Sequence, residues 1–149
     1  MTSSSDAGPE SRLLLPDPVR ETLHERAAAG APEEVCGVLV GERAPSDARR
    51  ERADRVAAAV AVPNVADEPE SRYELDPAET LGVIEDAESA GDDIVGFYHS
   101  HPRGPAEPSA IDRERATWPG HVYCILTRDG LAAYRWTGDE FRRLRVESS

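Results

Sequence analysis

The sequence predicts a single α/β domain, and three observations support this. The chain has 149 residues, which is enough for one hydrophobic core but not for two. Short β-branched runs alternate with two capped segments of helical character, as in helices packed on a sheet. Three further strand-like runs, joined by turns, end the chain. We therefore expect one domain over residues 11–147, preceded by a disordered acidic tail over residues 1–10.

The first half of the chain predicts one helix and two strands. Asp17-Pro18 is a helix start, with Asp17 as the N-cap and Pro18 at the first helical position, and Gly30 is a stop. Between them, apolar residues recur at every fourth position, which gives the helix one apolar stripe: Val19, Leu23 and Ala27. Two apolar, β-branched runs predict strands over residues 35–40 and 55–62. The charged, turn-rich stretch between them, 42–54, is expected to be a loop.

The second half predicts two helices and four strands. Asp76-Pro77 begins a helix that runs to about Ala90, before Gly91, and a shorter helix is expected over residues 110–116. Strands are expected over residues 93–98, 122–127, 131–136 and 141–146. Turns at Asp129-Gly130 and Gly138-Asp139 separate the last three of these strands.

The most informative motif lies where the strand over 93–98 ends. His99-Ser100-His101 is followed, after seven intervening residues, by Ser109-x-x-Asp112. Residues two apart at a strand end project to the same face, so both imidazoles can reach one point. Two histidines and a carboxylate supply three of the four ligands of a tetrahedral zinc, and the open fourth position, for water or substrate, is typical of a catalytic site. The motif therefore predicts one zinc ion per chain, held by His99, His101 and Asp112.

A purely structural interpretation of the same residues needs no metal. Ser109-x-x-Asp112 is close to a capping box, and His-x-His pairs occur on ordinary surface strands. At residue frequencies of a few per cent, however, the two fragments would meet at this spacing in only ~one in ten thousand chains of this length. The combination therefore favours the zinc site.

A zinc hydrolase also needs a general base for the attacking water. Glu33-Glu34 stands at the mouth of the strand over 35–40, where partial burial raises a carboxyl pKa toward neutrality. Spacing alone does not choose between Glu33 and Glu34. Both could equally be solvated charges at a helix–strand junction.

Together these segments resemble the JAMM (MPN-plus) metalloproteases. The resemblance rests on Glu-Val-Cys-Gly-Val-Leu-Val-Gly from Glu34, on His-Ser-His-Pro from His99 and on Pro-Ser-x-x-Asp from Pro108. It implies that His99, His101 and Asp112 are the zinc ligands, that Glu34 is the acid/base and that Ser109 stabilises the oxyanion. The implied fold is the MPN fold, a curved mixed β-sheet flanked by helices and related to the cytidine deaminases.

The resemblance also implies a substrate class. Members of the family cleave isopeptide or peptide bonds after the C-terminal glycine of ubiquitin-like proteins, whose extended tails pair with a strand edge. We expect the edge near residues 64–75 to serve here. Three alternatives remain: a peptidase that trims an adduct such as cysteine from a sulfur-carrier protein, a RadC-like protein, and a non-catalytic interaction scaffold. The RadC-like alternative is disfavoured by Ser100, where that branch has asparagine.

Composition excludes some partners and suggests a source. The net charge is −12, and all 17 basic residues are arginine. Such a chain is expected to avoid nucleic acid, whose phosphates would repel it, and anionic membranes. Abundant acid without lysine is typical of halophilic archaea, with a high-GC actinobacterium as the alternative source.

The remaining features predict a cytoplasmic protein. No run of 18 apolar residues is present, and residues 1–10 lack the basic and apolar regions of a signal peptide. Cys36 and Cys124 lie in apolar runs and are expected to be reduced, although pairing is possible if their strands are neighbours. The sequence leaves the oligomeric state open.

Overall fold

The computed structural model of the protein describes residues 12–44 and 53–148, and within these residues it has seven strands and three helices. The predicted tail over residues 1–10 lies outside the described residues. In chain order the elements are β1 (Arg12–Leu14), α1 (Asp17–Gly30), β2 (Cys36–Glu42), β3 (Ala53–Val62), α2 (Pro77–Ser89), β4 (Asp93–Ser100), α3 (Ala110–Arg115), β5 (Val122–Leu126), β6 (Leu131–Trp136) and β7 (Phe141–Glu147).

The strands form one mixed sheet that closes on itself in the order β1-β3-β2-β4-β5-β6-β7. Strand β4 lies at its centre, antiparallel to β2 and parallel to β5. Strand β1 is parallel to both β3 and β7 and joins the two ends of the sheet. The predicted mixed, curved sheet flanked by helices is confirmed. The closure of the sheet on itself was not part of that prediction.

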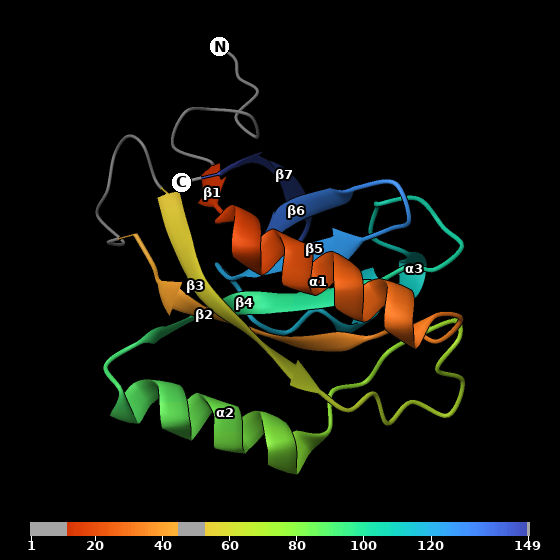
Figure 1. Ribbon diagram of the computed structural model, residues 1–149, viewed down its shortest axis with the longest axis horizontal. Helices are drawn as coiled ribbons and strands as arrows, with labels where there is room; N and C mark the ends of the chain where they lie inside the picture. The colour runs from red at the N-terminus through yellow and green to blue at the C-terminus, as the bar shows by residue number, and fades with distance from the viewer. Residues whose placement is uncertain (1–11, 45–52, 149) are drawn as a thin grey trace.

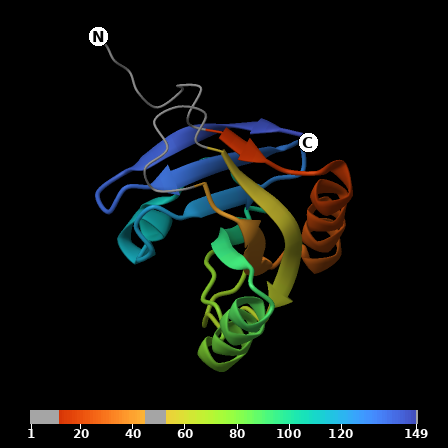
Figure 2. The same ribbon diagram turned by 90° about the vertical axis from the view of Figure 1, so that its left-hand side faces the viewer.

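Helices α1 and α2 cover different faces of the sheet (Figures 1 and 2). Strand β4 contributes side chains to both cores. Val95 and Tyr98 belong to the core under α1, in which Leu23 of the predicted helical stripe is fully buried. Ile94 and Phe97 belong to the core beside α2. The pairing register with β2 shifts between Ile94 and Gly96, so Val95 is an extra residue and the alternation of faces is interrupted there.

Several boundaries differ from the sequence prediction. Strand β1 was not predicted, since three residues are too few to show a period. Strands β2 and β3 extend into the predicted loop over 42–54, whose residues 45–52 lie outside the described part. Helix α1 begins one residue early, with Pro16 rather than Asp17 at its N-cap, so Asp17 supplies charge and no capping hydrogen bond.

The strand pairings leave little room around β4. A Cβ on Gly96 would collide with the main-chain carbonyl of Val122 on β5. Glycine at this point therefore lets β4 and β5 approach closely.

Within the described residues, no helix is long and apolar enough to cross a membrane.

Candidate metal centre

The histidine motif lies where the end of β4 meets the start of β2. His99 pairs with Cys36 in the antiparallel register. Between the two histidines, Ser100 exchanges hydrogen bonds with Val35: its main-chain N–H donates to the Val35 carbonyl at 3.0 Å, and its Oγ accepts from the Val35 N–H at 2.8 Å. The His101 N–H donates to the Leu126 carbonyl at 2.8 Å. These bonds fix the strand end that carries both imidazoles.

Helix α3 brings the carboxylate to the histidines. Ser109 is the N-cap of α3, and its Oγ accepts from the Asp112 N–H at 3.0 Å. The Ser109 N–H in turn donates to Asp112 Oδ2 at 2.9 Å, which completes a capping box. The structural interpretation of Ser109-x-x-Asp112 is therefore correct. It does not compete with the functional one, because the same box aims Oδ2 at the histidines.

Three donor atoms form an equilateral triangle. His99 Nε2, His101 Nε2 and Asp112 Oδ2 lie 3.1 Å from one another. Ligands at 2.0–2.1 Å in a tetrahedral site are separated by about 3.3 Å, so the triangle fits one face of a zinc tetrahedron. The His101 Nδ1–H donates to the Pro105 carbonyl at 2.9 Å, a second contact that orients the ring with Nε2 toward the triangle.

Burial and charge suit the three donors to a cation. His99, His101 and Asp112 are at most 8% exposed. Burial holds the pKa of His99 below its ordinary value, which keeps the ring neutral. Burial opposes ionisation of Asp112, yet the hydrogen bonds from His101 and His99 outweigh it and hold the pKa of Asp112 well below its usual range. Burial opposes protonation of His101, yet its hydrogen bonds with Asp112 and Pro105 raise its pKa, so a metal at Nε2 would have to displace a proton. Two imidazoles and one carboxylate are a donor set that zinc prefers.

Of the two candidate bases, Glu34 is the one at the site. It is 7% exposed, whereas Glu33 is exposed to solvent. A Glu34 carboxylate oxygen lies within 4.8 Å of ligand nitrogens of His99 and His101, so Glu34 also belongs to the potential metal-binding group. Burial raises its pKa to about 7, the Asp112 charge adds to the rise, and His101 opposes it. Its Oε1 has no hydrogen-bond partner among the described residues.

Tyr73 completes the wall of the site and was not identified from the sequence. Its ring stacks on His99 with centroids 4.2 Å apart and planes 20° apart. Burial raises the pKa of its phenol far above the ordinary value, so the ring stays neutral. No spacing signal marks Tyr73, because its position depends on how residues 64–75 fold back over β2.

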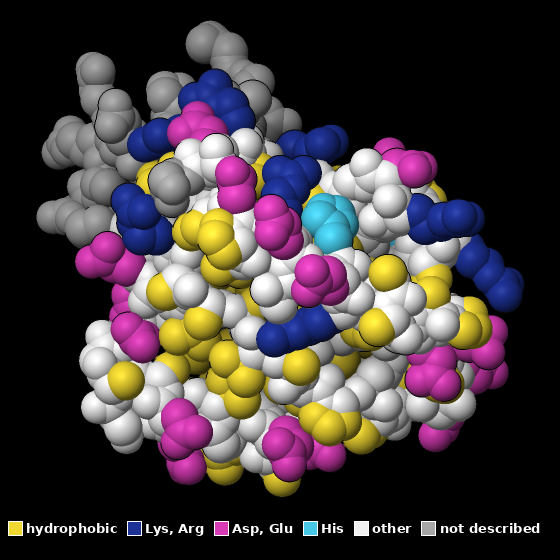
Figure 3. Space-filling model, viewed as in Figure 1, with side chains coloured by type: hydrophobic (Ala, Val, Ile, Leu, Met, Phe, Trp, Pro, Cys, Tyr) yellow, Lys and Arg dark blue, Asp and Glu magenta, His cyan; other side chains and the backbone are white. Residues whose placement is uncertain are grey.

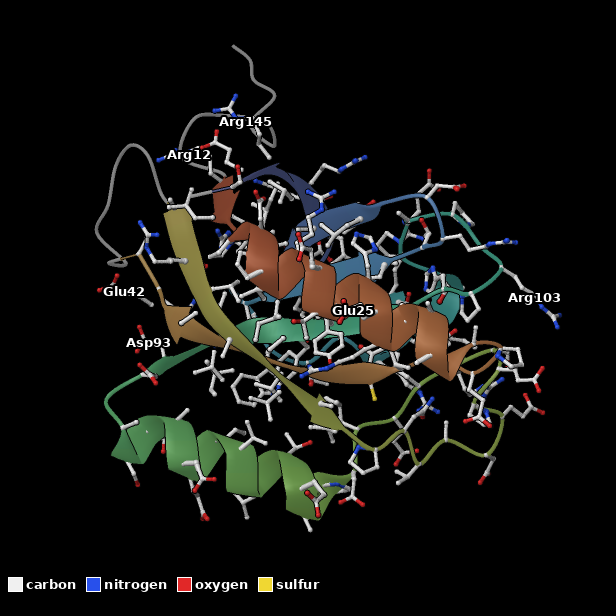
Figure 4. All side chains as sticks on the ribbon, viewed as in Figure 1. Arg12, Glu25, Glu42, Asp93, Arg103 and Arg145 are labelled. Carbon is white, nitrogen blue, oxygen red and sulfur yellow. The ribbon has the colours of Figure 1, made fainter. Side chains whose placement is uncertain are left out.

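Open space borders the site on the α1 side. A cavity of about 860 Å³ is lined by Ser100 and His101 together with residues of α1 and of the β5–β6 turn. Arg103, on the loop after β4, points outward at its rim (Figure 4). Its side chain is 80% exposed and lies 3.9 Å from a carboxylate oxygen of Glu70. The open space therefore reaches His101, whereas His99, Asp112 and Glu34 do not line it.

Fold and site together define a class: an α/β domain with a His-x-His strand end, a capped aspartate and a buried glutamate. Residues 16–144 match the family model of prokaryotic homologs of the JAB domain. The chain belongs to this family, and the resemblance to JAMM proteases is confirmed.

Curated relatives cover most of the chain. A desampylase from Haloferax volcanii is 55% identical over 141 residues, 91% of this chain and 96% of that protein. A probable TtuB-protein conjugate cleaving protease from Thermus thermophilus is 32% identical over 82% of this chain and 74% of its own length. A desampylase from Pyrococcus furiosus is 32% identical over 80% of this chain and 77% of its own length.

Solved structures share the fold. A protein from Desulfitobacterium hafniense superimposes with a TM-score of 0.79 at 25% identity, covering 92% of each chain. A protein from Salinibacter ruber gives a TM-score of 0.68 at 33% identity, covering 91% of each chain.

Proposed function

We propose that this chain is a zinc-dependent isopeptidase that removes small ubiquitin-like modifiers from lysines of target proteins, as its desampylase relatives suggest. The observation that carries the proposal is the triangle of His99, His101 and Asp112 with the buried Glu34 beside it. The catalytic domain is proposed to span residues 11–147.

The proposed ligands are His99, His101 and Asp112. Zinc in such a site activates a water molecule and polarises the scissile carbonyl. We assign Asp112 rather than Glu34 as the third ligand because Asp112 Oδ2 lies 3.1 Å from both histidine nitrogens. Glu34 is left for proton transfer, and its pKa of about 7 suits a group that must both accept and release a proton near neutrality.

Two side chains of the protein then act in different steps of the hydrolysis. Glu34 takes the proton from the attacking water and later gives it to the leaving lysine amine. Ser109 is exposed at the N-terminus of α3, where its hydroxyl can donate to the developing oxyanion while its lone pair accepts the capping bond from Asp112. The Ser109 side chain would thus both cap helix α3 and stabilise the oxyanion.

Residues 64–75 are proposed to hold the extended tail of the modifier. An isolated bridge between Asn64 and Leu75 shapes this segment, and the Glu34 N–H donates to the Pro69 carbonyl at 2.7 Å. The segment therefore lies directly beside the proposed base. A tail paired with it would deliver its terminal glycine to the site.

The test is hydrolysis of a lysine-linked conjugate of a diglycine-tailed ubiquitin-like protein. It is run in high salt with added zinc, with a chelator, and with the Asp112→Asn variant. Release of the intact modifier that the chelator and the substitution both abolish would support the isopeptidase.

Two other results would redirect the proposal. Cleavage only of a modifier that carries a single C-terminal cysteine would favour the sulfur-carrier peptidase. A folded chain that binds zinc and cleaves neither substrate, or binds no zinc, would favour a scaffold.

A further inference from the structure

Asn64 is the only carboxamide side chain in the sequence, which contains no other asparagine and no glutamine. It follows β3 and begins the segment over residues 64–75. Its side chain is partly buried and faces the main chain on both sides of it. A residue type used once in 149 positions invites the question of what its amide does.

Every hydrogen-bonding position of the Asn64 amide is used. Nδ2 donates to the Glu34 carbonyl at 2.9 Å and to the Arg72 carbonyl at 3.1 Å. Oδ1 accepts from the Ala66 N–H at 3.0 Å and from the Glu74 N–H at 2.9 Å. An amide offers two donors and two acceptor positions, so no other side chain of this size can replace the set.

These bonds hold the main chain of Glu34 from both sides. Its carbonyl accepts from Asn64, and its N–H donates to Pro69. Both partners belong to the 64–75 segment. The Glu34 carboxylate itself has an unpartnered buried oxygen, so its place in the site depends on the main chain that carries it. A shift of about 1 Å in a reacting group can lower a rate about 10²-fold.

We propose that Asn64 is a positioning residue that fixes the acid/base Glu34 and couples it to the segment that receives the modifier tail. The inference rests on the proposed isopeptidase function. It assigns Asn64 no contact with the reacting atoms; the residue acts through the Glu34 main chain. The coupling means that a disturbance in residues 64–75 reaches the base without touching the proposed zinc ligands.

The variant Asn64→Asp separates the two halves of the amide. Aspartate keeps the acceptor that holds Ala66 and Glu74, and it loses the donor to Glu34. Its carboxylate also repels the Glu34 carbonyl. We expect kcat on the conjugate to fall at least 10-fold, with zinc content unchanged and the amide of Glu34 exchanging hydrogen faster.

Thr137→Val is the matched control. Thr137 organises the exposed β6–β7 turn through contacts with the Glu140 carbonyl and with the Asp139 and Glu140 N–H groups. Losing these bonds far from the site should leave kcat unchanged. If Asn64→Asp does not fold, Asn64→Ser replaces it, because the shorter hydroxyl cannot make all four contacts.

The outcomes are distinct. An inactive wild-type chain would reject the proposed function, and hydrogen exchange of the Glu34 amide would then decide the role of Asn64: exchange that is no faster in Asn64→Asp overturns the inference. An active wild-type chain with an equally active Asn64→Asp variant would overturn the inference. A loss of activity that follows loss of zinc or a lowered Tm would overturn it too, because Asn64 would then serve only the fold.

Discussion

Two carboxylates meet the histidine pair, and their surroundings give them different properties. Asp112 receives the Ser109 N–H and lies 3.1 Å from both imidazoles, so it stays charged. Glu34 keeps an unpartnered buried oxygen, and burial raises its pKa to about 7. Paired carboxyl groups whose environments separate their pKa values commonly divide into a fixed charge and a proton carrier.

Substituting each carboxylate by its amide tests this division. Glu34→Gln should keep zinc and lower kcat by roughly 10² to 10⁴, the usual contribution of a general base. Asp112→Asn should lose the zinc itself, because the amide is a poor ligand. Metal content after dialysis and kcat on the conjugate are the measurements. Zinc loss in Glu34→Gln would instead identify Glu34 as a ligand.

Ser109 serves as a helix cap and as the proposed oxyanion donor, and two substitutions separate these roles. Ser109→Ala should lower the free energy of unfolding by about 1 kcal/mol, and Ser109→Gly by only a few tenths. Both remove the hydroxyl, so both should lower kcat by roughly 10²–10³. Denaturant melts and kcat measure the two effects. If the glycine variant keeps its activity, capping explains the serine completely.

The two cysteines should be inert in the folded chain. Both are free and buried, on strands β2 and β5, with β4 between them. Burial raises the pKa of Cys124 to about 12, so at pH 8 almost none of it is the reactive thiolate. Iodoacetamide at pH 8 should label Cys124 only after denaturant is added. Labelling at equal rates with and without denaturant would contradict this.

At the residue scale, the sequence predicted the site residues whose positions depend on their spacing along a single stretch of the chain. His99, His101 and Asp112 meet because a strand end and a helix start have fixed periods. The choice between Glu33 and Glu34 needed burial, which spacing does not reveal. The segment over 64–75 was expected to serve the substrate, but no pattern singled out Asn64 or Tyr73, because they reach the site only when this segment folds back against Glu34.

At the element scale the long, patterned segments were predicted and the shortest was not. Helix α1 and strand β6 have their expected ranges, except that Pro16 rather than Asp17 is the N-cap of α1. Strand β1 is visible only through its partners, since its three residues pair in parallel with β3 and β7. Closure of the sheet thus depends on pairing between strands that lie far apart in the sequence, which no local sequence pattern predicts.

Gly96 provides a test of the packing at the centre of the sheet. A Cβ there would meet the Val122 main chain, which cannot move without disturbing β5. Gly96→Ala should therefore lower the free energy of unfolding by about 1–3 kcal/mol, as overpacking does. Gly82→Ala is the control. In α2 a Cβ on Gly82 has nothing within 4 Å, so alanine should stabilise by up to about 1 kcal/mol. Equal effects in denaturant melts would refute the argument.

At the scale of the whole molecule, the excess of acidic side chains is the feature with the clearest consequence for stability. Acidic side chains are spread over the face in Figure 3 rather than gathered in one patch. Ion pairs such as Arg142–Glu140 lie at the surface, where each contributes little. With a net charge of −12, self-repulsion opposes the compact state in dilute buffer.

We therefore expect Tm to rise with salt, and the range of the rise identifies its cause. Screening alone should act mainly below a few tenths molar, because the Debye length is already about 10 Å at 0.1 M and about 3 Å at 1 M. A rise that continues from 1 M to 3 M NaCl or KCl would require more than screening, such as ions and water held by the dense carboxylates. Thermal melts by circular dichroism over this range measure both parts. A Tm that does not depend on salt would show that the absence of lysine reflects codon composition, as in a high-GC bacterium, and not adaptation to brine.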